Sequence, residues 1–177
     1  TDGVNWTQVT ASADWSARLY HHSVVYDGKI WIIGGASSLG FKNDVWSSSN
    51  GVNWTQATAS ANFTGISLHE SVVQDGKMWV MGGAVSSTGF KNDVWSSSDG
   101  MNWTQMTASA GWSARQNFVA LVYDKKMWIM GGWDGSNYVN DIWSSTNGLD
   151  WTEVTALPDW SPRLEPAGIV YDEKIWI

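Results

Sequence analysis

The chain has 177 residues, a formal net charge of -7, no cysteine and 15 tryptophans. The acidic balance and the lack of any Lys/Arg cluster argue against nucleic acid or an anionic membrane surface as a partner. No apolar run reaches the roughly 18 residues that a membrane span needs, and without cysteine neither disulfides nor thiolate metal sites can form. We expect no bound cofactor.

The strongest pattern is a repeat of about 48 residues. Three sets of residues recur at this spacing: Trp6, Trp54, Trp103 and Trp151; the pairs Gly34-Gly35, Gly82-Gly83 and Gly131-Gly132; and Asp44, Asp93 and Asp141. A fixed period of roughly 40–50 residues is typical of propellers and solenoids, in which each unit buries its apolar face against a neighbour.

The first complete repeat predicts four short strands and no helix. The strands are expected at residues 21–26, 29–33, 45–48 and 52–58. Asp27-Gly28 and Asn50-Gly51 are hairpin-turn signals, and the strand at 29–33 is apolar on both faces, as in a sheet covered on both sides. Gly34-Gly35 ends that strand and lets the backbone pass close to an aromatic ring of a neighbour. Four antiparallel strands per unit make a propeller blade.

This register divides the chain into five parts. They are residues 1–15, the outermost strand of a split blade; 16–63, 64–112 and 113–160, three complete blades; and 161–177, the two inner strands of a partial blade. The fourth unit lacks the positions equivalent to 33–48, so the ring is incomplete and leaves unpaired strand edges. We expect the sequence to be a piece of a longer array or, alternatively, to complete its ring by self-association.

The repeat resembles the kelch repeat, in which an arginine, a glycine pair, an Asn-Asp-Val-Trp segment and a last tryptophan follow one another. It is represented by Arg18, Gly34-Gly35, 43–46 and Trp54, then by Gly82-Gly83, 92–95 and Trp103, then by Arg115, Gly131-Gly132, 140–143 and Trp151. Ile66 stands where the other repeats have Arg18, Arg115 and Arg163. The resemblance implies an all-β propeller in which these residues are structural. We expect the arginines to bridge blades by hydrogen bonds to loop carbonyls, with the recurring aspartates as partners.

The turn at 97–103 also resembles the Asp-box of sialidase-like propellers, although its siblings carry Asn50 and Asn147. In either family this turn is a fold element, and it implies no activity. The three arginines raise the alternative of a carboxylate-binding cluster, but their repetition at one period favours an architectural role. The absence of cysteine excludes the Cys-linked tyrosine cofactor of kelch-type copper oxidases.

The histidines offer at most a weak metal site. They are His21, His22 and His69, with Glu70 beside the last. His21 and His69 are in register and could share a metal in the channel, but the later repeats carry Phe118 and Pro166 instead, so no ring of ligands forms. We favour a packing role and predict no metal and no catalytic residue.

The loops that follow the glycine pairs are the expected place for ligand binding, because the strands are committed to packing. Loops 36–42 and 84–91 are near-duplicates, whereas the third repeat has Trp-Asp-Gly-Ser-Asn-Tyr at 133–138. This composition is typical of sugar-stacking or protein-binding surfaces. We predict a ligand site formed by Trp133, Asp134, Asn137 and Tyr138. The alternative is that Trp133 covers the adjacent blade.

Together these observations predict a non-catalytic propeller scaffold that binds protein or carbohydrate, of a bacterial secreted or surface protein. Two alternatives remain open. One is part of a glycan-active propeller enzyme, sialidase-like or a sugar epimerase, with its catalytic residues outside this sequence. The other is a structural repeat array that self-associates.

Overall fold

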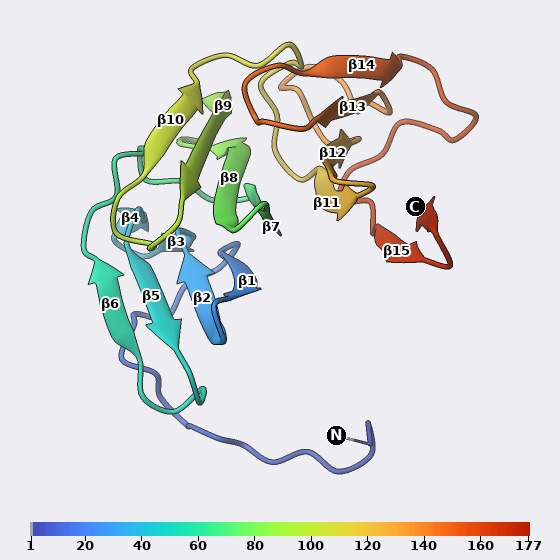
Figure 1. Ribbon diagram of the computed structural model, residues 1–177. Coiled ribbons are helices and arrows are strands. Elements are labelled where there is room, and N and C mark those ends of the chain that lie inside the picture. The colour runs from blue at the N-terminus through green and yellow to red at the C-terminus, as the bar shows by residue number, and fades with distance from the viewer. Residues whose placement is uncertain (1) are drawn as a thin grey trace.

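A computed structural model describes residues 2–177, and within them it contains strands β1 to β16 and no helix (Figure 1). Blade 1 is formed by β1 (His22–Tyr26), β2 (Lys29–Ile33), β5 (Val45–Ser48) and β6 (Thr55–Thr58). Blade 2 is formed by β7 (Glu70–Gln74), β8 (Lys77–Ala84), β9 (Phe90–Ser97) and β10 (Thr104–Thr107). Blade 3 is formed by β11 (Val119–Tyr123), β12 (Lys126–Met130), β13 (Ile142–Ser145) and β14 (Thr152–Thr155). Two short sheets remain: β15 (Ile169–Tyr171) with β16 (Lys174–Trp176), and β3 (Ala36–Ser37) with β4 (Gly40–Phe41).

All ladders within the sheets are antiparallel, and each blade runs in chain order from its first to its fourth strand. The blades are arranged along an arc with their first strands on the inside, so that β1 contacts β7, β7 contacts β11 and β11 contacts β15 (Figure 1). The predicted all-β fold, with three four-stranded blades and an incomplete ring, is confirmed.

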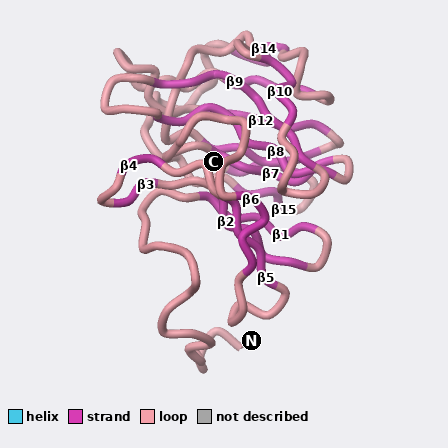
Figure 2. Tube along the Cα trace, turned by 90° about the vertical axis from the view of Figure 1, so that its left-hand side faces the viewer, coloured by secondary structure: helices cyan, strands magenta, loops and turns pink. Residues whose placement is uncertain are grey.

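Residues 2–15 form no strand, although residues 1–15 were expected to supply the outermost strand of a split blade. An outermost strand needs a third strand to pair with, and the sheet β15–β16 contains no third strand. The N-terminal end of the chain therefore extends as a loop beyond the strands (Figure 2), while Asp14 accepts a hydrogen bond from the Trp54 N–H of blade 1 at 3.2 Å. Thr1 lies outside the described residues.

Two strand boundaries differ from the prediction for local reasons. The fourth strand begins at Thr55 rather than at residue 52, because the Asn50 side-chain oxygen accepts hydrogen bonds from the backbone N–H groups of Val52 and Asn53 and holds them in the turn. In blade 2 the glycine pair does not end the strand. Instead β8 continues through Gly82-Gly83 with a register shift, and it pairs with a longer β9.

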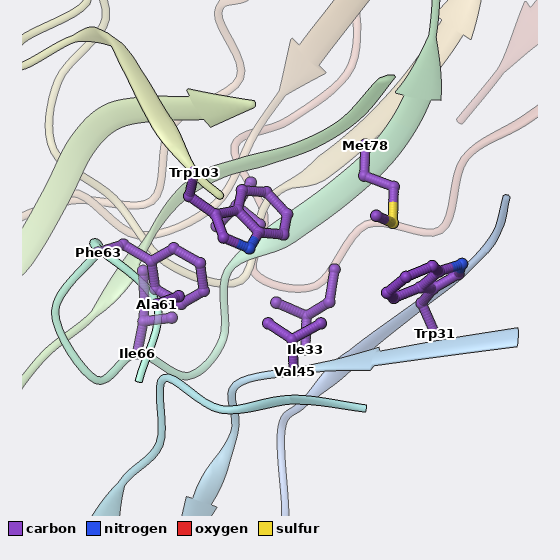
Figure 3. Packing of buried hydrophobic residues seen from close by; sticks show 9 residues of the cluster. Trp31, Ile33, Val45, Ala61, Phe63, Ile66, Met78 and Trp103 are labelled. Carbon is purple, nitrogen blue, oxygen red and sulfur yellow. The ribbon is translucent and has the colours of Figure 1, made fainter. Parts of the chain in front are cut away.

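The hydrophobic core lies between the blades. The first cluster combines Trp31, Ile33 and Val45 of blade 1, Ala61, Phe63 and Ile66 of the connecting segment, and Met78, Val80 and Trp103 of blade 2 (Figure 3). A second cluster joins blade 2 to blade 3 in the same way, with Met127 and Ile129 fully buried. Each sheet thus needs a neighbouring sheet to bury its apolar side chains, as the apolar strands predicted.

Glycines allow the closest approaches between blades. A Cβ placed on Gly100 would lie 2.1 Å from the Trp31 ring, and one on Gly148 would lie 2.2 Å from the Trp79 ring. Each of these turns is therefore in contact with a tryptophan of the preceding blade. No helix long and apolar enough to cross a membrane occurs among residues 2–177.

Candidate binding site at the loop face

Strand direction defines two faces of the molecule. The segments that precede the first strands and the loops that follow the second strands lie at one end of the blades, which we call the loop face. The tight hairpins between first and second strands, such as Asp27-Gly28, lie at the opposite end, the hairpin face. The predicted ligand-binding loop, residues 133–138, belongs to the loop face.

The 133–138 loop is held by its own aspartate. The Asp134 Oδ1 atom accepts hydrogen bonds from the backbone N–H of Ser136 at 2.8 Å and from that of Asn137 at 2.7 Å. One oxygen of the carboxylate is therefore used to form the turn. The Trp133 and Tyr138 rings face each other, with centroids 5.0 Å apart and planes inclined by 58°. Trp133 is half-buried and Tyr138 is 53% exposed, so the aromatic pair is open to solvent.

This loop contacts both the preceding blade and the centre of the loop face. A Cβ on Gly135 would lie 3.0 Å from the Phe90 ring of blade 2, so the loop packs against that neighbour. Trp133 also exchanges two backbone hydrogen bonds with Gln116, at 2.9 and 3.0 Å. Because Asn117 follows directly in the chain, the aromatic pair lies next to the mouth of the central channel.

The channel mouth is a cavity of about 210 Å³ at the inner edge of the blades. It is lined by Tyr20, His21, His22, Leu68, His69, Glu70, Asn117, Phe118, Glu165 and Pro166, which come from four successive repeats. Shortly before each first strand one residue has a left-handed backbone, with φ of 55° at Tyr20, 54° at Leu68, 53° at Asn117 and 50° at Glu165. Backbone hydrogen bonds link these four residues into a chain. The N–H of Leu68 donates to the Tyr20 carbonyl at 3.1 Å, that of Asn117 to the Leu68 carbonyl at 3.2 Å, and that of Glu165 to the Asn117 carbonyl at 2.8 Å.

The four left-handed residues share one backbone geometry but have four different side chains. Left-handed φ is unfavourable for residues other than glycine, and it persists only where the surrounding structure imposes it. The hydrogen-bonded chain between blades imposes it here. The Asn117 side-chain amide also donates to the Glu165 carboxylate, which links two of the four side chains.

His69 is packed between blades 1 and 2 rather than presented as a ligand. It is 3% exposed, and a Cβ on Gly34 would lie 3.0 Å from its ring. Phe118 occupies the equivalent place against Gly82. Neither ring nitrogen of His69 has a hydrogen-bond partner within residues 2–177. Burial, with a further contribution from the neighbouring histidines, lowers the pKa of His69 to about 3, so this imidazole is neutral at physiological pH.

The Nε2 atom of His22 and the Oε2 atom of Glu70 lie 3.0 Å apart at the mouth, within hydrogen-bonding distance. No group of three or more histidine, aspartate or glutamate side chains in residues 2–177 is placed to hold a metal ion. The mouth therefore offers imidazole, amide and carboxylate groups for hydrogen bonding.

The arginines are occupied by aspartates of their own repeat. Arg18 donates to both carboxylate oxygens of Asp44, at 2.6 and 2.9 Å, and Arg115 donates to both oxygens of Asp141, at 2.6 and 2.7 Å. Each also donates to the carbonyl of the first glycine of its pair, and all these partners belong to the same repeat, so the expected bridge between blades is not formed. Burial would raise the pKa of Asp44, but the hydrogen bonds from Arg18 and Trp46 outweigh it and lower that pKa below its ordinary value.

The side chain of Arg163 hydrogen-bonds only to Ser161 within the described part of the chain, and its guanidinium lies 5.4 Å from the centroid of the Trp160 ring. Because Arg18 and Arg115 are occupied, they cannot act as a cluster that binds a ligand carboxylate.

The recurring tryptophans and Asp-box-like turns are local structural units. The indole N–H of Trp54, Trp103 and Trp151 donates to the carbonyl of Gly51, Gly100 and Gly148, at 3.2, 3.1 and 3.2 Å. Each of these indoles meets an aromatic ring of the segment that enters its blade, namely Trp15, Phe63 or Trp112, with centroids 5.8, 5.3 and 5.8 Å apart. The same turn forms at residues 2–6, where Asp2 accepts from the N–H groups of Val4 and Asn5.

The sequence indicated the aromatic loop but not the ring of left-handed residues beside it. Those residues differ in type at every repeat, so no residue pattern marks them. Their position next to His21 and His69 was the only available signal.

The comparisons with known proteins agree with this geometry. Residues 114–144 match the Kelch motif family. The fold is similar to a solved structure described as "Structure of YjhT", with a TM-score of 0.73, 15% sequence identity, and coverage of 89% of this chain and 57% of that chain. The chain thus spans little more than half the length of that structure. No curated protein matches it in sequence.

Four-stranded antiparallel sheets that pack face to face around a central channel define a β-propeller. The matched motif contains the pair Gly131-Gly132 and Asp141, whose counterparts recur in the other two blades, and Arg115, whose counterpart in blade 1 is Arg18. The fold is accordingly a β-propeller, and residues 114–144 of its third blade match the kelch motif.

Proposed function

We propose that this propeller is a non-catalytic binding module that holds a protein or carbohydrate ligand at the loop face. The observation that carries the proposal is the solvent-open Trp133–Tyr138 pair, with ring centroids 5.0 Å apart, in a loop that departs from its near-duplicate siblings. Aromatic faces of this kind stack on sugar rings or anchor protein partners at low entropic cost.

The rigidity of the loop supports this proposal. Asp134 fixes the turn, the Trp133 backbone is bonded to Gln116, and Gly135 packs on Phe90. A preorganised surface loses less conformational entropy when it binds. The nearby mouth adds hydrogen-bonding groups, including the Asn117–Glu165 pair.

The occupied arginines speak against the glycan-active enzyme of sialidase type. Arg18 and Arg115 each donate to an aspartate of their own repeat, and the lining of the mouth contains carboxylates but neither lysine nor arginine. An acidic sugar at the mouth would face Glu70 and Glu165 without a compensating cation.

A glycan array and a pull-down with cross-linking test the proposal with two variants. Trp133→Ala removes the aromatic face, and we expect at least about a tenfold loss of binding. Leu39→Ala is the matched control, because Leu39 is 86% exposed in the sibling loop of blade 1. Equal binding by wild type and Trp133→Ala would refute the loop site, and turnover of a sialoside by wild type would refute the non-catalytic assignment.

A second proposal, self-association through the end sheet β15–β16, rests on a separate observation. Trp176 is 52% exposed, whereas its counterparts Trp31 and Trp79 are 4% and 3% exposed because a following blade covers them. A second copy that packs on β15–β16 would bury Trp176 together with Val170 and Tyr171. Native mass spectrometry tests this idea: a defined dimer supports it, and a monomer at micromolar concentration refutes it.

A further inference from the structure

The last residue of the first strand is the starting point of a separate inference at the hairpin face. Tyr26, Tyr123 and Tyr171 occupy this position in three repeats, and Gln74 occupies it in blade 2. The Tyr26 hydroxyl donates to the carbonyl of Gly76 at 2.7 Å and to that of Ser98 at 3.1 Å, both in the following blade. The Tyr123 hydroxyl likewise donates to the carbonyl of Glu173 at 2.6 Å.

Gln74 keeps the polar contacts of these tyrosines but lacks their ring. Its side-chain amide donates to the carbonyls of Lys125 at 2.6 Å and Thr146 at 3.5 Å, which are the equivalents of Gly76 and Ser98. Two methylene groups therefore stand where a phenol ring stands in the sibling interface. Gln74 is 8% exposed, and its Oε1 atom has no hydrogen-bond partner within residues 2–177.

A cleft of about 690 Å³ is found at this place between blades 2 and 3. It is lined by Val73, Gln74, Asp75, Val122, Lys125 and Thr146. Its volume lies within the range of about 300–1,000 Å³ typical of small-molecule sites, and Val122, which packs toward blade 2, gives it an apolar wall.

Lys125 is a second departure from the repeat in the same cleft. The corresponding hairpin residues are Gly28, Gly76 and Glu173, so only blade 3 has a cation here. Lys125 has a left-handed φ of 58°, a conformation that favours glycine, and it forms no ion pair with any other described residue. Two residues that break the pattern, 51 positions apart, are thus in direct contact.

We propose that this interblade cleft binds a small aromatic carboxylic acid. The ligand ring takes the space that the sibling tyrosines fill, against Val122. Its carboxylate faces Lys125, and a ring hydroxyl donates to the unpartnered oxygen of Gln74. Asp75, the one acidic lining residue, disfavours the reverse orientation. The site lies at the hairpin face, so it is independent of the loop-face site.

The test uses 4-hydroxyphenylacetate as probe and 4-methylphenol, which lacks the carboxylate, as comparator. In isothermal titration calorimetry we expect wild type to bind 4-hydroxyphenylacetate once per chain, with Kd of about 1 mM or tighter. Gln74→Tyr restores the sibling residue, so it should fold and fill the cleft, weakening both compounds at least about tenfold. Lys125→Gly should weaken 4-hydroxyphenylacetate alone. Circular dichroism verifies that each variant is folded.

Trp133→Ala serves as the control that separates the two sites, because it should leave both titrations unchanged. The proposal is overturned if wild type gives no binding up to about 20 mM probe, or if folded Gln74→Tyr binds as wild type does. It is also overturned if Lys125→Gly affects the phenol and the acid equally.

Discussion

The interface between blades 1 and 2 and the interface between blades 2 and 3 are two versions of one arrangement. In both, a tryptophan of the earlier blade packs on a turn glycine of the later one: Trp31 on Gly100, and Trp79 on Gly148. In both, a ring of the later blade packs on a glycine of the earlier one. What the two interfaces share is the packing that makes the propeller.

The differences between the two interfaces lie at a few equivalent positions. Four residues of the first interface are replaced at the equivalent positions of the second: Tyr26 by Gln74, Ile66 by Arg115, His69 by Phe118, and Asp99 by Asn147. Each exchange keeps the local backbone but changes the chemistry of the side chain. Repetition therefore identifies the architecture, and departures from it identify where the two interfaces should respond differently.

The largest effect is expected where the shared packing is broken. Gly148→Ala places a Cβ 2.2 Å from the Trp79 ring at a residue with φ of 71°. Overpacking and the left-handed backbone together should lower the free energy of unfolding by about 4 kcal/mol. Gly76→Ala is the control, because its φ is 66° but no atom lies within 4 Å of the added Cβ. It should lose only about 1 kcal/mol in urea denaturation. Equal losses would mean that the tryptophan contact contributes nothing.

The arginine pair of the second interface gives the next largest effect. Arg115→Gln removes a fully buried guanidinium and leaves the partly buried Asp141 carboxylate without its ionic partner, and we expect a loss of about 3 kcal/mol in unfolding free energy. Arg163→Gln, at an exposed arginine whose side chain hydrogen-bonds only to Ser161 among the described residues, should change stability by less than about 0.5 kcal/mol. The unfolding free energies of the two variants are compared by calorimetry or by urea denaturation. Similar values for both would contradict a stabilising role of the pair.

The histidine of the first interface should make stability depend on pH. The pKa of His69 is about 3 in the folded state and near 6.5 when unfolded, so between these values the unfolded chain binds the extra proton. Stability should therefore fall as the pH drops from 6.5 toward 3. His69→Phe, which copies Phe118, should remove this loss and be less acid-sensitive than wild type by about 2 kcal/mol at pH 5. Parallel stability curves for the two proteins across this range would refute the assignment.

The smallest effect concerns the turns. Hydrogen bonds from the backbone N–H of Asn102 and neighbouring groups lower the pKa of Asp99 to about 2. Because the folded pKa is depressed, this stabilisation is complete above pH 4 and is lost as the pH falls toward 2. Asp99→Asn, which copies Asn147, should change stability by no more than about 0.5 kcal/mol at pH 7 and should lack that acid loss. Acid unfolding of the two proteins provides the comparison, and an unchanged acid transition would count against it.

The repeat period predicted the blades well because each blade is specified by local turn signals and by strands that are apolar on both faces. The fourth strand was predicted too long, since the side chain of Asn50 captures backbone N–H groups that the pattern assigned to the strand. The role of the arginines within their own repeat could not be read from spacing, because spacing does not fix which way a guanidinium points.

The candidate sites likewise contain features that are visible in the sequence and features that only the folded chain shows. Trp133 was recognisable because it is out of register, and the departure at Gln74 was equally visible in the sequence. Its significance depends on Lys125, which only the folded chain brings into contact with it. The four left-handed residues of the channel mouth share only a backbone conformation. Because their residue types differ, the sequence does not reveal that conformation.

Those four positions have a practical consequence for engineering. One left-handed backbone conformation accommodates four different side chains, those of tyrosine, leucine, asparagine and glutamate. The conformation therefore does not depend on which of them is present. A combinatorial library at Tyr20, Leu68, Asn117 and Glu165 would vary the lining of the channel entrance while the sheets that support it stay intact.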